Sequence, residues 1–229
     1  MRQILIIGGS SGIGLGLVNH LSKDNRIYAT YNTNPKSSTE NVNYLPFNVL
    51  TEPLQTDALP EILDGFVYCP GSILLKPWSR FSEEEILNDY RLQVVGFLKC
   101  LSIISLKLKR SSNPSIVLFS SIAASMGMPF HAMVSSTKSA IEGMTRSLAA
   151  ELSPSIRINC IAPSLTDTPL ATNLLNTDEK RLISDAKHPM KRIGKVEDIV
   201  SMAEFLLSEK STWITGQILH VDGGMSAIK

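Results

Sequence analysis

The feature that most constrains the fold is a glycine-rich turn close to the N-terminus. Residues 3–7 form an apolar run of strand length, and Gly-Gly-Ser-Ser-Gly-Ile-Gly follows at once, before a helical pattern from Leu15 to Leu21. This order suits a dinucleotide, because glycines let the backbone approach the phosphates and the helix N-terminus offers free N–H groups. The turn therefore predicts a nucleotide site; the plainer alternative is a glycine turn without a ligand. The predicted contacts are Gly8, Ser10, Ser11, Gly12, Ile13 and Gly14.

Composition narrows the classes of partner. The 229 residues suit one α/β domain, and 43% hydrophobic with 19% charged residues suffice for a sizeable core. A formal net charge of +1 argues against nucleic acid or an acidic membrane surface as a partner. No apolar run reaches the roughly 18 residues of a membrane span, and the N-terminus begins a strand rather than a signal peptide. We therefore expect a cytoplasmic protein.

The cysteines and histidines indicate neither disulfides nor a metal site. Cys69, Cys100 and Cys160 are odd in number, far apart and in apolar surroundings, which favours buried reduced thiols. The four histidines are scattered and form no cluster of metal ligands. We therefore expect no metal.

The stretch 115–152 places polar residues where open α/β sheets bind ligands. The apolar run Ile116–Phe119 ends in Ser120-Ser121, and after a loop of small residues a long helical segment carries Lys138 near its start. Ligands of open parallel sheets bind outside the carboxyl ends of the strands. Ser121 and Lys138 are therefore candidate active-site residues.

This layout resembles the core of the short-chain dehydrogenase/reductase family, in which a Ser at the end of a strand meets a Tyr-x-x-x-Lys pair on the next helix. Ser121 matches the Ser and Lys138 matches the Lys, whereas the Tyr position, four residues before Lys138, holds Val134. The resemblance implies that the Lys holds the nicotinamide ribose and that the Ser steadies the substrate oxygen. It leaves the proton donor open, because a Val side chain cannot donate a proton.

Two further candidates match the family in part. His131 lies seven residues before Lys138, about two helical turns, and enoyl reductases of the family place their acid at that offset. The plainer interpretation is a loop residue beside Pro129. Gln93 stands three residues before Gly96, where the family has an Asn, and offers the same amide on a longer side chain. Dienoyl-type reductases of the family carry Ser in place of Tyr, so the loss of Tyr does not by itself exclude reductase chemistry.

The residues after the predicted strand 26–31 bear on the choice of cofactor. An acidic residue at this point selects NAD by binding the adenosine ribose, but residues 30–34 contain no carboxylate. A 2′-phosphate would not be repelled, and Lys36 is near in sequence although no Arg is. We therefore expect NADP in preference to NAD, with Tyr31 and Asn32 at the ribose; the alternative is a solvated loop.

The other expected walls of the cofactor site depart from the family at several positions. Asn48-Val49 stands where the family often has Asp-Val. Of the family's Asn-Asn-Ala-Gly motif, only the Gly is present, as Gly71. Ser164 replaces the Gly of the family's Pro-Gly turn. The resemblance places the following at the cofactor, together with Lys138: Asn48, Val49, Cys69, Pro70, Gly71, Pro163, Thr166 and Thr168. Residues from about 165 to 190 would form a mobile lid, which lacks a strong pattern from Ala171 to Met190.

The resemblance covers essentially the whole chain, most closely the bacterial 3-oxoacyl reductases. It implies one domain, residues 1–229, with a three-layer Rossmann fold: a seven-stranded parallel sheet with helices on both faces. Related reductases pair through the helices that here span residues 82–109 and carry Lys138. Both helices have apolar positions beyond one core-facing stripe, at Leu98, Leu101, Ile104, Leu108, Met144 and Leu148. We expect a homodimer or homotetramer; the alternative is one wide core face.

Three functions are consistent with these residues. The first is an NAD(P)-dependent oxidoreductase that acts on a carbonyl or enoyl group of a small molecule, with Ser121, Lys138 and either His131 or water. The second is a catalytically weak or inactive nucleotide-binding sensor or scaffold, because Val134 replaces the Tyr. The third is a structural subunit that pairs with an active relative. We favour the first.

Overall fold

The computed structural model describes residues 1–228, and these contain one parallel sheet of seven strands in the order β3-β2-β1-β4-β5-β6-β7. The strands are β1 (Gln3–Ile7), β2 (Arg26–Tyr31), β3 (Val42–Pro46), β4 (Gly65–Tyr68), β5 (Ser115–Phe119), β6 (Arg157–Pro163) and β7 (Ile218–Val221). Central strands β4, β5 and β6 are buried along their whole length, which explains the apolar runs of β4 and β5; β6 also buries Arg157 and Asn159. The predicted sheet is confirmed.

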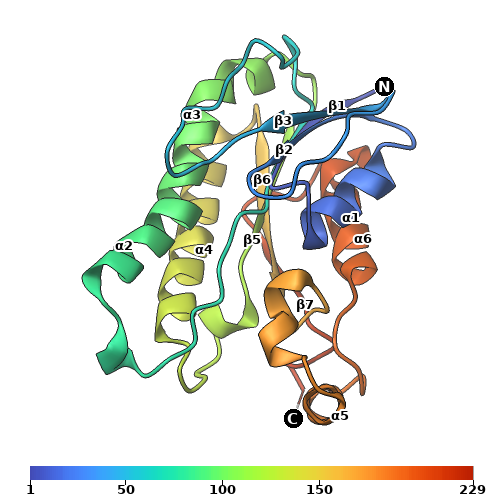
Figure 1. Ribbon diagram of the computed structural model, residues 1–229. Helices are drawn as coiled ribbons and strands as arrows, with labels where there is room; N and C mark the ends of the chain where they lie inside the picture. Colours follow the sequence, from blue (N-terminus) through green and yellow to red (C-terminus); the bar gives the residue numbers. More distant parts are fainter. Residues whose placement is uncertain (229) are drawn as a thin grey trace.

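Helices cover both faces of the sheet (Figure 1). One layer is α1 (Gly12–Leu21) and α6 (Val196–Leu207); the other is α2 (Glu83–Tyr90), α3 (Gly96–Lys109) and α4 (Ala132–Leu152). A hydrophobic core lies on each face of the sheet, and side chains that alternate along β1 contribute to both. Leu5 and Ile7 pack with residues of α3 and α4, whereas Ile4 and Ile6 pack with residues of α1 and α6. The three-layer architecture therefore follows from side chains that point to opposite faces of each strand.

Helices α2 and α3 are joined by a single π-helical turn at Arg91–Val95. A capping box opens α2, with Ser82 and Glu85 satisfying each other's backbone N–H groups. Within the π turn the N–H of Gly96 donates to Arg91, so the carbonyl of Leu92 is released and accepts the hydroxyl of Tyr68 instead. Such turns widen a helix locally and occur often at functional sites; here the turn contains Gln93.

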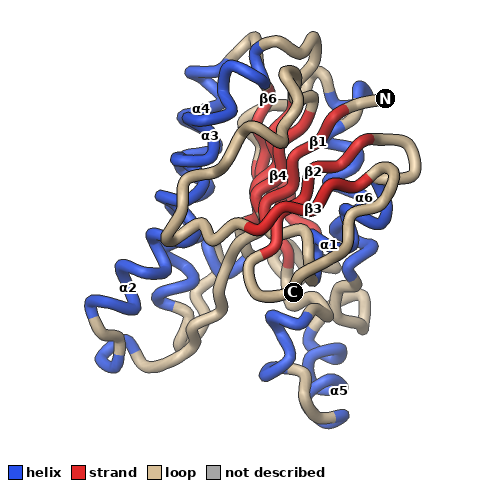
Figure 2. Tube along the Cα trace, turned by 45° about the horizontal axis from the view of Figure 1, so that its top comes forward, coloured by secondary structure: helices blue, strands red, loops and turns tan. Residues whose placement is uncertain are grey.

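The segment predicted as a lid, which lacks a strong sequence pattern, is largely helical. A 3₁₀ helix spans Pro169–Leu174 and α5 spans Asp178–Lys187, with the Thr177 side chain accepting the N–H of Lys180 as a cap. None of the residues of α5 is buried, so the helix has no apolar stripe that a sequence pattern could reveal. Figure 2 shows α5 standing away from the sheet at the edge where the strands end.

Two element boundaries near the site have local causes. The sixth strand begins at Arg157 and continues to Pro163. The last long helix begins at Val196, because Asp198 accepts the N–H of Lys195 and pairs with Arg192 in front of the first turn.

The apolar positions of α3 divide between the core and the surface. Leu101, Ile104 and Leu108, which we expected at an interface between chains, are buried in the core of the same chain. Met144 and Leu148 of α4 are partly buried against that core. Four apolar side chains of the π turn and α3 are exposed: Val95, Leu98, Ile103 and Leu106, the last of them 68% exposed.

Three further properties concern the residues that the structure describes. None of their helices combines the length and the hydropathy needed to cross a membrane. They contain no group of three or more His, Cys, Asp or Glu side chains placed to bind a metal ion. The three cysteines are free thiols, and burial raises the pKa of Cys69 to about 12.

Candidate active site

A cavity of about 830 Å³ opens at the carboxyl edge of the sheet, between the strand ends and the lid. Among its described lining residues there is no carboxylate, whereas Lys138, Lys180 and Lys187 all contribute to it. The predicted cofactor residues that line it are Gly8, Ser10, Ser11, Gly12, Ile13, Gly14, Asn32, Asn48, Val49, Cys69, Pro70, Gly71, Lys138, Pro163, Thr166 and Thr168. Tyr31 does not line it; its neighbours Thr30 and Asn32 do, since side chains alternate along a strand.

The glycine turn has the backbone geometry of an anion site. Gly8 and Gly12 have positive φ angles of 80° and 51°, and a Cβ added at Gly14 would lie 2.1 Å from the carbonyl oxygen of Gly8. Ser11 caps α1 without a side-chain hydrogen bond, and the first turn of α1 carries no acidic residue. The first N–H groups of α1 are thus left for a ligand, as a pyrophosphate requires.

The end of β2 lies next to this turn. Thr30 is buried, and its hydroxyl accepts the N–H of Gly8 at 3.0 Å, which ties the turn to β2. Asn32, Thr33 and Asn34 line the cavity and bring no negative charge. The residues present therefore fit a nicotinamide dinucleotide.

Lys138 points from α4 toward the end of β5. Its ammonium donates to the carbonyl of Phe119 at 3.1 Å. Burial lowers the pKa of Lys138 below its usual value, against the opposing effects of Cys160 and Asp89.

The two adjacent serines after β5 have different roles. Ser120 donates its hydroxyl to Oε1 of Glu142 at 2.7 Å, a contact between β5 and α4. Ser121 lines the cavity, and its oxygen accepts the N–H of Ala123 at 3.2 Å, so its proton is free to donate to a ligand. Ser121 is thus the serine available for chemistry.

Val134 occupies the cavity wall one helical turn before Lys138. It is 7% exposed and lines the same cavity as Ser121 and Lys138. A hydrocarbon therefore stands where the resemblance places a phenol.

His131 lies just before the first residue of α4, with φ of −96° and ψ of 12°. Its Nδ1 is 2.8 Å from the carbonyl of Pro129, which can only accept, so Nδ1 carries the proton. The ring is partly exposed and borders both the main cavity and a second cavity of about 490 Å³.

Gln93 is buried behind the cavity wall rather than lining it. Its amide nitrogen donates to Asp89 at 2.8 Å, whereas its amide oxygen has no partner among the described residues. A Cβ added at Gly71 would lie 3.5 Å from both that oxygen and the ammonium of Lys138. The π turn therefore directs Gln93 toward Lys138, on the far side of Gly71.

Two buried polar residues near the cavity, Asp89 and His188, were not predicted from the sequence. Asp89 is four residues before Gln93 and also accepts the hydroxyl of Ser72. His188 follows α5, in the segment that lacked a pattern, and lies 3.0 Å from Ser164. An acid at the i−4 position could have indicated the first; nothing local indicates the second.

Fold and site together define a dinucleotide-binding α/β protein that carries the Ser and Lys of a reductase. Residues 55–226 match the family model described as enoyl-(acyl carrier protein) reductase. The chain belongs to the short-chain dehydrogenase/reductase family.

Relatives of known sequence agree over nearly the whole length. A 3-oxoacyl-acyl-carrier-protein reductase of Staphylococcus epidermidis is 28% identical, over 98% of both chains. A tropinone reductase homologue of Arabidopsis thaliana is 29% identical, over 98% of this chain and 92% of its own. The family was thus predicted correctly.

Solved structures share the fold. The ligand-free aldohexose dehydrogenase of Thermoplasma acidophilum superposes with a TM-score of 0.90, at 24% identity over 100% of this chain and 95% of its own. ElxO with NADP bound superposes with a TM-score of 0.85, at 24% identity over 98% of both chains.

Proposed function

We propose that the chain is an NAD(P)-dependent oxidoreductase that reduces a carbonyl or enoyl group and prefers NADP. The observation that carries the proposal is one cavity, with no carboxylate among the residues described in its wall, in which the glycine turn, Ser121 and Lys138 meet. A bound reduced nicotinamide supplies a hydride. The glycine turn and α1 would bind the pyrophosphate, Lys138 the ribose, and Ser121 the oxygen of the substrate.

A second candidate is a nucleotide-binding sensor or scaffold with little or no turnover. The hydrocarbon side chain of Val134 in the cavity wall favours it, because the group that donates the proton in the family is missing. Both functions require nucleotide binding, so only turnover separates them.

The test is a fluorescence titration with NADPH and NADH, followed by single-turnover oxidation of NADPH with a panel of ketones and enoyl thioesters. NADPH is expected to bind more tightly than NADH, since the residues after β2 repel no 2′-phosphate. Oxidation of NADPH with at least one substrate is expected. Binding without oxidation would favour the sensor, and tighter NADH binding would reject only the NADP preference.

We also propose that the chain forms a homodimer or homotetramer. The exposed apolar side chains of the π turn and α3, which are Val95, Leu98, Ile103 and Leu106, offer a face that a second copy could cover. Light scattering is expected to give at least twice the 25.1 kDa of one chain. Leu98→Glu with Leu106→Glu is expected to lower that mass, and Leu182→Glu on the lid, also exposed, serves as the control. A wild-type mass of one chain would reject the proposal.

A further inference from the structure

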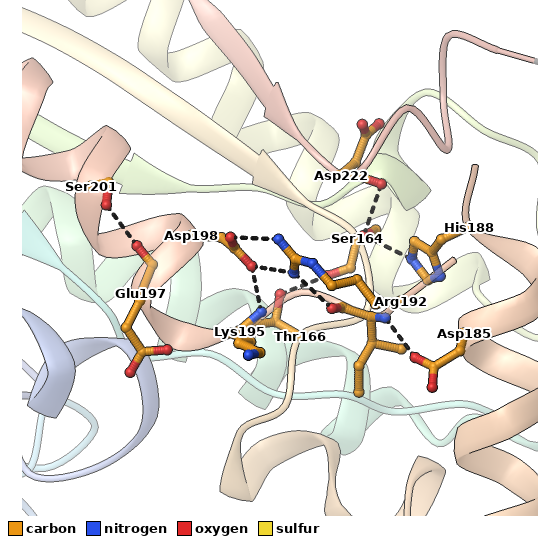
Figure 3. Close-up of polar contacts among 11 residues, drawn as sticks. Ser164, Thr166, Asp185, His188, Arg192, Lys195, Glu197, Asp198, Ser201 and Asp222 are labelled. Carbon is orange, nitrogen blue, oxygen red and sulfur yellow. Dashed lines mark hydrogen bonds and ion pairs between the residues drawn. The ribbon is translucent and has the colours of Figure 1, made fainter. Parts of the chain in front are cut away.

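Ser164 and His188 form a hydroxyl–imidazole pair in the cavity wall. Ser164 follows β6 and His188 follows α5, and Nε2 of His188 lies 3.0 Å from Oγ of Ser164 (Figure 3). His188 is only 4% exposed, and both side chains line the cavity that contains Ser121 and Lys138. The pair is thus buried on one side and faces the reaction space on the other.

The partners of the pair determine where its protons can be. Nδ1 of His188 lies 2.7 Å from the carbonyl of Ser184, which only accepts, so Nδ1 carries a proton. In the neutral ring, Nε2 must then accept the proton of Ser164. In the imidazolium, Nε2 donates to Ser164, and the serine proton turns to the carbonyl of Asp222 at 3.3 Å or to a ligand. Every polar group has a partner in both states, so the pair can pass a proton.

Backbone contacts hold the ring in place. The carbonyl of His188 accepts the N–H of Lys191 at 2.9 Å, and Asp185 accepts the N–H of Ile193 at 2.7 Å. Met190 donates to the carbonyl of Gly223 at 3.3 Å. These contacts, part of them visible in Figure 3, fasten the end of the lid before any ligand binds. The same contacts would be present if the pair of Ser164 and His188 only held the lid in place. The experiment below separates this structural role from proton transfer.

Ser164 and the serine expected at the substrate oxygen follow neighbouring strands. Strands β5 and β6 are parallel with Phe119 opposite Ile161, and the backbone N–H of Ser120 donates to the carbonyl of Ile161 at 2.7 Å. The same register places Ser121 opposite Pro163, so Ser164 comes one residue later at the same edge of the sheet, and both serines line the cavity.

We propose that Ser164, supplied by His188, delivers the proton in carbonyl reduction, in place of the missing Tyr; the inference rests on the proposed function. As hydride adds to the carbonyl carbon, the π electron pair moves to the oxygen, which takes the hydroxyl proton of Ser164. The Nε2 proton of the His188 imidazolium restores the hydroxyl, and a proton from bulk solvent then returns to Nε2, so one solvent proton is consumed for each carbonyl reduced. Ser164 is the catalytic residue and His188 the positioning residue that replenishes it.

The kinetic test uses Ser164→Gly, His188→Gln and their double variant in the full chain, with NADPH and a ketone that the wild type reduces. Each single change is expected to lower kcat by about 10²–10⁴-fold, with KM and NADPH affinity little changed. The double variant is expected to lose no more than the larger single loss, since the residues act as a unit. Ser164→Thr, which keeps a hydroxyl, is expected to recover most of the loss. His20→Gln on exposed α1 is the control.

A measurement without substrate tests the pair itself. In protein with ¹⁵N-labelled histidine, the His188 ring signals are assigned by their loss in His188→Gln, and Ser164→Gly is expected to shift the Nε2 signal but not those of His20. An unchanged signal would overturn the pair. A raised KM with unchanged kcat in Ser164→Gly would overturn the proton path and would assign the pair only the structural role of holding the lid. A wild type that binds NADPH yet oxidises it with neither a ketone nor an enoyl thioester would overturn the proposed function, whereas a wild type that reduces only enoyl thioesters would overturn the proton path alone.

Discussion

Adding Val134→Tyr to Ser164→Gly is expected to restore turnover by about 10²–10⁴-fold, the contribution of a positioned proton donor. Val134 lines the cavity one helical turn before Lys138, so a phenol at this position projects into the reaction space beside the ammonium. The new Tyr would complete the Ser, Tyr and Lys set of the family around Ser121 and Lys138. Stopped-flow oxidation of NADPH with an activated ketone measures the gain.

The matched control is Val134→Phe in the same Ser164→Gly background. It adds the same ring without the hydroxyl, so it fills the same part of the cavity and donates no proton. No gain is expected from Phe. An equal gain from Phe and Tyr would mean that packing, not proton donation, limits the rate. Failure of Tyr to help, with NADPH affinity intact, would show that position 134 does not face the substrate oxygen.

Gly12→Asp is expected to weaken NADPH binding by about 100-fold or more. Gly12 begins α1 with φ of +51°. The carboxylate of the introduced Asp would lie where the N-terminus of α1 presents its free N–H groups. A negative charge at this point competes for those groups and repels the pyrophosphate. A loss of about 100-fold corresponds to about 2.8 kcal/mol of binding free energy, and the fluorescence titration measures it.

Two variants isolate the cause of that loss. Gly12→Asn has nearly the same size and tolerates positive φ equally well but is neutral, so it is expected to bind NADPH more tightly than Gly12→Asp. Gly127→Asp adds the same charge at a glycine with open space around it and ordinary φ, and it is expected to bind like the wild type. Equal binding by Gly12→Asp and the wild type would reject the nucleotide site at the glycine turn.

Much of the fold and part of the site could be predicted from local sequence. The glycine turn needs only consecutive residues, because Gly8, Gly12 and Gly14 satisfy φ angles and clearances within one turn. The helical period alone places Val134 on the same side of α4 as Lys138, four residues later, and both line the cavity. Ser121 follows from the end of the apolar run of β5.

Tertiary packing determines which apolar residues of a helix are buried and where a polar side chain points, and local sequence patterns do not predict either. On α3, Leu101 and Leu98 are both apolar at helical spacing, and only the layer above the sheet determines that the first is in the core and the second on the surface. The amide of Gln93 reaches toward Lys138 because a π turn and the hydroxyl of Tyr68 reshape the helix.

The pair of Ser164 and His188 shows the same limit most clearly. Its residues are 24 positions apart, and no helix or strand period relates them. The chain leaves the sheet in α5, and two contacts then hold the following segment beside the end of β6. These are the hydrogen bonds from Ile193 N–H to Asp185 and from Met190 N–H to the carbonyl of Gly223, and they bring His188 to Ser164. The sequence by itself determined the class of protein, the glycine turn and the absence of a Tyr before Lys138. Only the tertiary structure brought a second hydroxyl and an imidazole into the same cavity, since that contact depends on long-range packing rather than on local periodicity.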